Sequence, residues 1–146
     1  MASALDYPAR GKVLRVEGNV VVFNPAGTTY ELHLQNHDGA ELPSASPAAV
    51  SCYIRCNARK VWTMASGGNF VTPIFGPPRV VQGRVRYMEE HLGVVHAGAP
   101  VIVTWPTEGT AFDLINGPVI PGVMVNVTLL AGATFELAAA PVTQPG

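Results

Sequence analysis

The sequence predicts an all-β protein: two tandem, diverged, five-stranded small barrels packed together. Three observations predict this class. Short runs rich in valine and aromatic residues are separated by Gly and Pro turns, and no stretch repeats its apolar residues with a sustained helical period. The second half of the chain also resembles the first at a nearly constant offset, which indicates an internal repeat.

The repeat consists of two matched segments. Residues 11–17 match residues 83–89 at an offset of 72, and residues 50–65 match residues 123–138 at an offset of 73. Matched pairs include Gly11/Gly83, Val50/Val123, Cys52/Val125, Ile54/Val127 and Trp62/Phe135. Few pairs are identical, so the prediction depends on the offset, which stays close to half of the 146 residues.

The repeat divides the chain into three parts. Residues 1–65 are the first barrel with a short N-terminal arm, residues 66–82 are a Gly- and Pro-rich connector, and residues 83–146 are the second barrel with a short mobile tail. Units this small bury little surface alone, so we expect them to share a core or an interface.

Turn residues and period-two patterns place the strands. In the first unit we expect strands at 11–17, 19–24, 28–34, 49–57 and 60–65, and in the second at 83–89, 92–97, 100–105, 122–130 and 133–139. The polar residues 35–48 and the segment 106–121 are predicted loops. The pattern does not order the strands, so OB-like and SH3-like barrels (like the oligonucleotide-binding fold or the SH3 fold) both remain open.

Composition favours a protein partner over nucleic acid. Charged residues make up 13% of the chain, against about 25% in typical domains, so we expect exposed apolar surface and a homo-oligomer or larger protein assembly. The net charge of -1 argues against bulk phosphate neutralisation. The chain's first residues lack an apolar segment and no run is long enough to span a membrane, so we expect a cytoplasmic protein without membrane contact.

Two cysteines and two histidines suggest a metal site. His33, His37, Cys52 and Cys56 have spacings that suggest zinc. On a strand, however, Cys52 and Cys56 lie about 13 Å apart, and both belong to the face that the repeat places inward. We therefore expect core cysteines, no metal site and no cofactor.

The opposite face of the same strand is basic. It presents Tyr53, Arg55 and Arg59, with Lys60 beside them, a pattern that single-strand nucleic-acid binders use for phosphates and bases. The alternative, which we favour, is a solvated face whose charges keep the protein soluble. Trp62 adds nothing to the basic face, because its match with Phe135 predicts a core position.

The connector is the second candidate site. The turn Ser66–Asn69 is Gly-rich but no helix follows it, so a phosphate cradle is weakly indicated. Asn69, Phe70, Phe75 and Arg79 are predicted to lie at the inter-repeat junction or to line a ligand pocket there. Such a pocket would suit a small-ligand carrier or an enzyme.

Catalytic candidates are few. Glu89 and Glu90 are neighbours on a strand and face opposite ways, and His91, His96 and Asp113 belong to no recognisable motif. We therefore expect no enzyme, and a non-catalytic structural or protein-interaction module is the first hypothesis. The alternatives are binding of single-stranded nucleic acid or another polyanion by the basic face, and a pocket between the repeats.

Overall fold

The computed structural model describes residues 3–37 and 49–138. The elements are η1 (Ala4–Asp6), β1 (Ala9–Glu17), β2 (Val20–Pro25), β3 (Glu31–Asn36), β4 (Val50–Met64), β5 (Phe70–Thr72), β6 (Phe75–Gly76), β7 (Val80–Met88), β8 (Leu92–His96), β9 (Pro100–Thr104), η2 (Gly109–Ala111), β10 (Phe112–Asp113), β11 (Met124–Leu129) and β12 (Thr134–Leu137). The described strands form one 12-stranded sheet, which confirms the all-β class. Most of the predicted loop at 35–48 and the predicted mobile tail lie outside the described residues.

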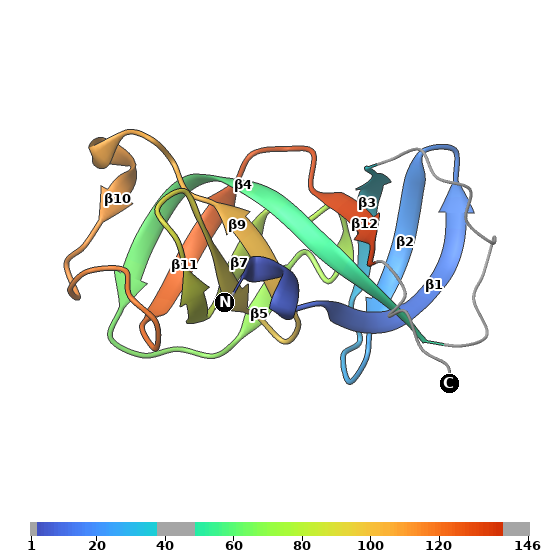
Figure 1. Ribbon diagram of the computed structural model, residues 1–146, viewed down its shortest axis with the longest axis horizontal. Helices are drawn as coiled ribbons and strands as arrows, with labels where there is room; N and C mark the ends of the chain where they lie inside the picture. The colour runs from blue at the N-terminus through green and yellow to red at the C-terminus, as the bar shows by residue number, and fades with distance from the viewer. Residues whose placement is uncertain (1–2, 38–48, 139–146) are drawn as a thin grey trace.

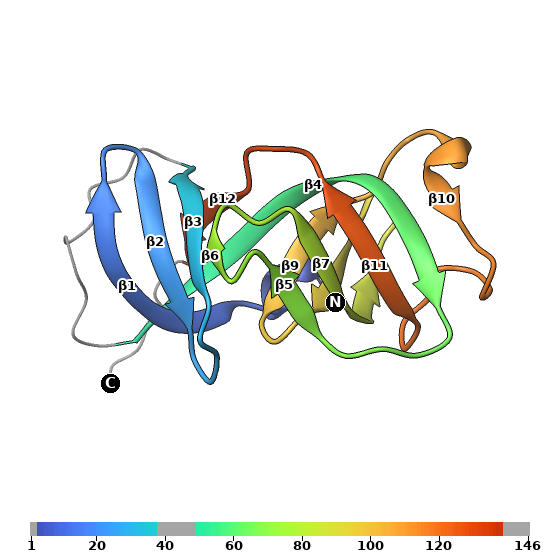
Figure 2. The same cartoon turned by 180° about the vertical axis from the view of Figure 1, so that it is seen from behind.

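The long strand β4 connects the two ends of the molecule. It runs from the group of β1, β2, β3 and β12 to the group of β7, β9 and β11 (Figures 1 and 2). Two strands were predicted here, but the chain stays in one strand through a β-bulge at Arg59, because Lys60 pairs with Thr128 whereas Ala58 pairs with Leu129. The bulge moves the buried positions from even to odd numbers along the strand.

The strand pairings close two rings that share β4. The first ring follows β1, β2, β3, β12 and β4 back to β1. The second follows β7, β8, β9, β4 and β11 back to β7. Each ring therefore contains a strand segment from the other half of the sequence, an exchange that the sequence did not predict.

The first hairpin of each half has the same register. Lys12 on β1 pairs with Asn24 on β2, and 72 positions further along both strands Arg84 pairs with His96. The register shifts once in each hairpin, between Val13 and Arg15 in the first and between Val85 and Tyr87 in the second. The bulged residues are thus Leu14 and Arg86, again 72 positions apart.

A large apolar cluster runs through both ends of the fold, as expected for halves that share a core. Phe23 and Phe135 pack with ring centroids 5.6 Å apart, although they come from opposite ends of the sequence. The buried hydroxyl of Tyr30 donates a hydrogen bond to the carbonyl oxygen of Ala97 at 3.0 Å. This bond ties the first half to the second inside a core that water does not reach.

The N-terminal arm packs on the outside of the second ring. The Ser3 hydroxyl caps η1, and Ala4 is buried in a small cluster with Val94 and Ile102. The ring of Tyr7 stacks on Tyr87 at 5.8 Å. Residues 3–9 thus cover the outer face of β8 and β9.

Gly11 and Gly83 occupy equivalent positions in the two hairpins, and each allows its neighbouring strand to approach closely. A Cβ atom at Gly11 would overlap the carbonyl oxygen of Asn24, and one at Gly83 would overlap that of His96. Gly11→Ala and Gly83→Ala should each lower the free energy of unfolding by about 1–3 kcal/mol, measured by urea denaturation. Gly68→Ala is the control, because nothing lies within 4 Å of its added Cβ. Tolerance of alanine at Gly11 or Gly83 would show that the strands do not approach this closely.

Candidate functional site

The basic face predicted on β4 is largely engaged within the chain. Arg55 Nε donates to Glu136 Oε1 at 2.7 Å, and its guanidinium lies 5.9 Å from the ring centroid of Tyr53. The Tyr53 hydroxyl donates to the carbonyl oxygen of Leu5 at 2.7 Å. Arg55 therefore has a partner for its charge, and Tyr53 holds the N-terminal arm.

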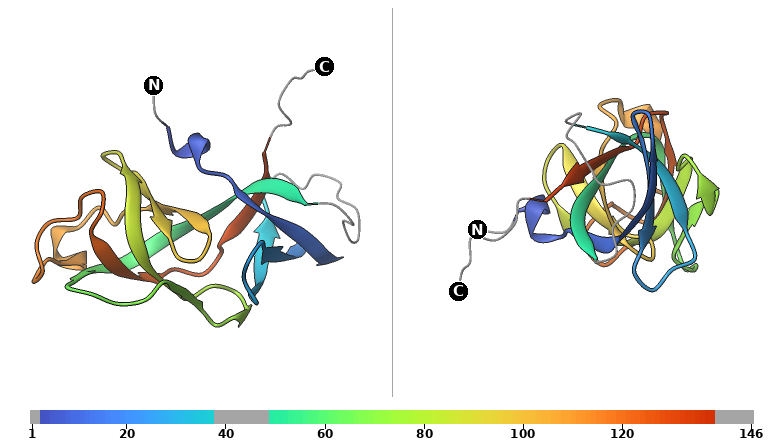
Figure 3. Two further views of the ribbon diagram at one scale, coloured as in Figure 1. Left: turned by 90° about the horizontal axis from the view of Figure 1, so that it is seen from below. Right: turned by 90° about the vertical axis from the view of Figure 1, so that its right-hand side faces the viewer.

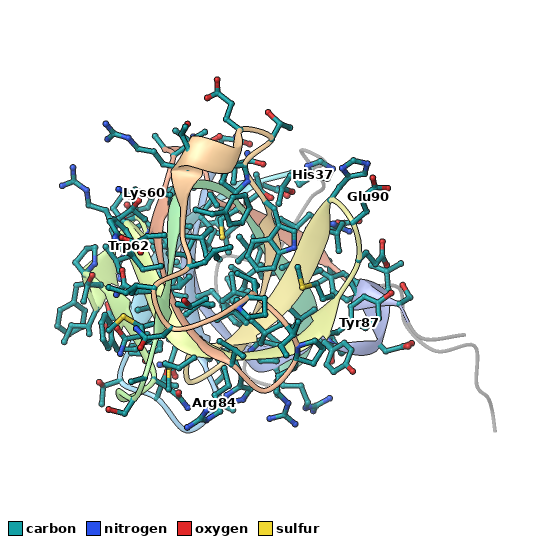
Figure 4. The ribbon with its side chains drawn as sticks, turned by 90° about the vertical axis from the view of Figure 1, so that its left-hand side faces the viewer. His37, Lys60, Trp62, Arg84, Tyr87 and Glu90 are labelled. Atoms are coloured by element: carbon teal, nitrogen blue, oxygen red, sulfur yellow. The ribbon has the colours of Figure 1, made fainter. Side chains whose placement is uncertain are left out.

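Of the other two residues of this face, Arg59 forms the bulge and Lys60 follows it. Arg59 is exposed, and Lys60 Nζ lies 4.9 Å from the ring centroid of Trp62. Lys60 and Trp62 lie on the same side of the molecule (Figure 4). The predicted core position of Trp62 is wrong: Trp62 is half-buried on the outer side, whereas Phe135 is fully buried. The bulge at Arg59 is the physical reason, because it makes Val61 and Thr63 the inward residues.

The connector hydrogen-bonds to both halves of the chain. Strand β6 pairs with β3 of the first half, and the N–H of Leu129 in the second half donates to the carbonyl oxygen of Arg79 at 2.9 Å. The predicted junction residues do not meet in one pocket, however. Asn69 lines one cleft and Arg79 a different groove, while Phe70 is half-buried and Phe75 is 59% exposed.

An apolar groove lies along the connector. It has a volume of about 370 Å³ and is lined by Pro73, Pro77, Pro78, Arg79, Leu129, Leu130 and Ala131. Leu130, which lines the groove, is 49% exposed, and Ile74 and Phe75, which lie in the chain between the lining residues Pro73 and Pro77, are 43% and 59% exposed. We call this surface the connector groove. The connector lies on the side of the molecule opposite the N-terminal arm (Figure 3).

A second hollow is basic. It has a volume of about 400 Å³ and is lined by Asn69, Arg84, Val85, Arg86, His96, Pro121 and Gly122. We call it the β7–β8 cleft, because both arginines come from β7 and the histidine from β8. Arg84 points outward, away from Lys60 and Trp62 (Figure 4).

Sequence reasoning named only part of this cleft. Asn69 was assigned to the junction and His96 was a catalytic candidate without a motif, while the two arginines were missed. The alternation of Arg84 and Arg86 on one strand was the available signal, because residues two apart share a face. Nothing in the sequence indicated that Pro121 and Gly122 would complete the cleft.

Both cysteines are buried in β4, as predicted for core positions. Burial raises the pKa of the Cys56 thiol to about 12 and moves the pKa of Cys52 further above its ordinary value. Cys56 Sγ contacts the carbonyl oxygen of Ile102 at 3.7 Å. Within residues 3–37 and 49–138, no three His, Cys, Asp or Glu side chains are placed to hold a metal ion.

The candidate acids and bases near β8 pair with their neighbours at the surface. His91 Nε2 lies 3.6 Å from Glu90 Oε1, and both side chains are exposed. The Tyr87 hydroxyl donates to Glu89 Oε2 at 2.6 Å, and this hydrogen bond is the main cause that raises the pKa of Tyr87 to about 12. These contacts lie at an exposed turn, where Glu90 and His91 line a hollow of about 240 Å³ together with Trp105, Pro106 and Thr107.

Comparison with known proteins yields no match to a family model, to a curated protein or to a solved structure. Within the described part of the chain, no helix has the length and apolarity needed to cross a membrane. The connector groove and the β7–β8 cleft are the two candidate functional surfaces.

The buried cysteines generate a chemical prediction. Thiol reagents attack the thiolate, and the raised pKa together with burial keeps both thiols protonated and inaccessible. At mildly alkaline pH, Ellman's reagent should label neither cysteine in the native protein and both in concentrated guanidinium. Rapid labelling of one cysteine without denaturant would contradict the buried position of that side chain.

Proposed function

We propose that this protein is a non-catalytic structural module that self-associates through the connector groove. One observation carries the proposal: Phe75, which is 59% exposed, lies in the chain between Pro73 and Pro77, and both prolines line an apolar groove. A protruding apolar side chain next to an apolar hollow is self-complementary. Two copies related by a two-fold axis can therefore each place Phe75 in the groove of the other.

The architecture that we propose for this module is a pair of diverged five-stranded small barrels that exchange strands. The two closed rings of pairings support it. The common register and bulge position of the two hairpins, 72 positions apart, support descent of both from one duplicated unit. An exchange of this kind makes each small unit dependent on the other, which suits units that bury little surface alone.

The energetics favour burial of Phe75 on a partner. Transfer of a phenylalanine side chain from water to an apolar site stabilises by about 1.5–3 kcal/mol, and a two-fold contact gains this twice. Three of the seven residues that line the groove are prolines, which lose little side-chain entropy on binding. Arg79 is the single charged residue of that lining, so little desolvation opposes the contact.

Polyanion binding at β4 has no comparable support. The ion pair of Arg55 with Glu136 and the hydrogen bond of Tyr53 engage half of the predicted residues within the chain. A polyanion would have to displace Glu136 before it reached Arg55.

The proposal predicts that a charged residue in place of Phe75 dissociates the oligomer without unfolding the chain. Phe75→Lys should raise the dissociation constant at least ~100-fold, because both copies lose an apolar contact. Light scattering across a concentration series measures the mass, and circular dichroism with a thermal scan checks the fold. The wild-type chain should have the mass of a discrete oligomer.

Ile115→Lys is the matched control. Ile115 is 82% exposed and belongs to the loop between β10 and β11, so its substitution adds the same charge at another exposed apolar position. This variant should keep the wild-type mass. A monomeric wild-type chain, or an oligomer lost with Ile115→Lys and kept with Phe75→Lys, would refute self-association through the groove.

A further inference from the structure

We propose that the β7–β8 cleft binds the phosphate group of a small phosphomonoester. The cleft and the connector groove lie apart along β7 and β11. Arg84 of the cleft pairs with Met124 at one end of β11, whereas Val80, which follows the groove residue Arg79, pairs with Thr128 near the other end. Binding there is therefore independent of self-association. Four residues whose side chains can donate hydrogen bonds line this hollow: Asn69, Arg84, Arg86 and His96.

Within the described residues, neither arginine has a carboxylate partner for its charge. No carboxylate of the described residues lies within 4 Å of Arg84 or Arg86, whereas Arg15 and Arg55 both have one. The cleft is thus locally positive in a chain whose net charge is -1. An oxyanion would supply the missing counter-charge through charge-assisted hydrogen bonds, which are about twice as strong as neutral ones.

The wall opposite β8 holds Arg84 in place. Arg84 Nη1 donates to the carbonyl oxygen of Gly122 at 2.9 Å. The Gly122 loop is itself fixed to β7, because Gly122 N–H donates to Val85 O at 2.7 Å and Val85 N–H donates to Val123 O at 2.9 Å. One guanidinium group is therefore oriented before a ligand arrives, which lowers the entropic cost of binding.

The Asn69 side of the cleft is positioned by a buried amide. Gln82 is 6% exposed, and its Nε2 donates to the carbonyl oxygen of Gly68 at 2.8 Å. Its Oε1 accepts from Asn126 Nδ2 at 2.9 Å. The hydrogen bond from Gln82 to Gly68 holds the Gly-rich turn beside the two arginines. The sequence alone indicated this turn only weakly as a phosphate cradle.

The first hairpin shows that the fold does not need these side chains. The positions that correspond to Arg84, Arg86 and His96 in the equivalent register are Lys12, Leu14 and Asn24. Leu14 forms the bulge of the first hairpin that corresponds to the bulge at Arg86, so this bulge position accepts an apolar residue. The basic cluster therefore belongs to one hairpin only, which is expected of a binding site and not of a structural requirement.

The chemistry and size of the cleft select the ligand class. Two arginines suit a doubly charged phosphate better than a single carboxylate, because a phosphomonoester offers three terminal oxygens to separate donors. A volume of about 400 Å³ lies within the range of small-molecule sites and exceeds that of a phosphate group. Val85 and Pro121 offer apolar contact to the organic part of the ligand.

Isothermal titration calorimetry at low ionic strength tests the proposal, with phenyl phosphate as the probe. Phenyl phosphate should bind, and acetate at the same ionic strength should not. Arg84→Gln and Arg86→Gln should each weaken binding about tenfold or more, since each removes a charge-assisted hydrogen bond. Both arginines are exposed, and circular dichroism verifies that the variants fold.

Lys12→Gln is the matched control. It removes one positive charge at the position that corresponds to Arg84 in the first hairpin, and it should leave the affinity for phenyl phosphate unchanged. Equal weakening by Lys12→Gln would reveal nonspecific attraction and overturn the proposal. Absence of phenyl phosphate binding, or binding of oligothymidylate alone, would overturn it as well, the latter in favour of a nucleic-acid surface.

Discussion

The backbone pairing of β4 is the constraint on which the rest of the fold depends. This strand pairs with β1 and β12 in its first part, and with β9, β10 and β11 further along. Both rings of pairings pass through it, so neither ring closes without it. The bulge at Arg59 is what allows one strand to serve both, because it keeps Ile54 inside the first ring and Val61 inside the second.

On this framework, the two hairpins carry different chemistry at matching positions. Glycine at 11 and at 83 permits the same close approach, and the register that follows is the same. What differs is the outward side chains: one hairpin presents a leucine at its bulge and the other an arginine. In two hairpins that match in this way, the residues that hold the backbone are distinct from the outward residues that can differ in chemistry.

The longer strands were predictable because the period-two pattern of Val, Leu and Tyr is a local property of the sequence. The short strands β5, β6 and β10 were not predicted, and β10 lies within the segment 106–121 that was expected to be a loop. The partners of the strands were not, since β12 pairs with β3 and β4 across long stretches of chain. The bulge at Arg59 leaves no local signal, so the position of Trp62 was misassigned. The β7–β8 cleft was missed for the same reason as the exchange: Arg84 and Gly122 meet only after β11 has paired with β7.

The exchange of β12 also determines when the first ring of strand pairings can close during synthesis. On the edge of β3 away from β2, Gln35 and Asn36 receive their partners only when residues 134 and 135 have left the ribosome. Until then the edge of β3 beyond its short contact with β6 lacks a neighbour, although β1 and β2 already exist. A nascent chain held at that stage offers this edge to the β12 of any neighbouring copy, and the intramolecular exchange would then become an intermolecular one.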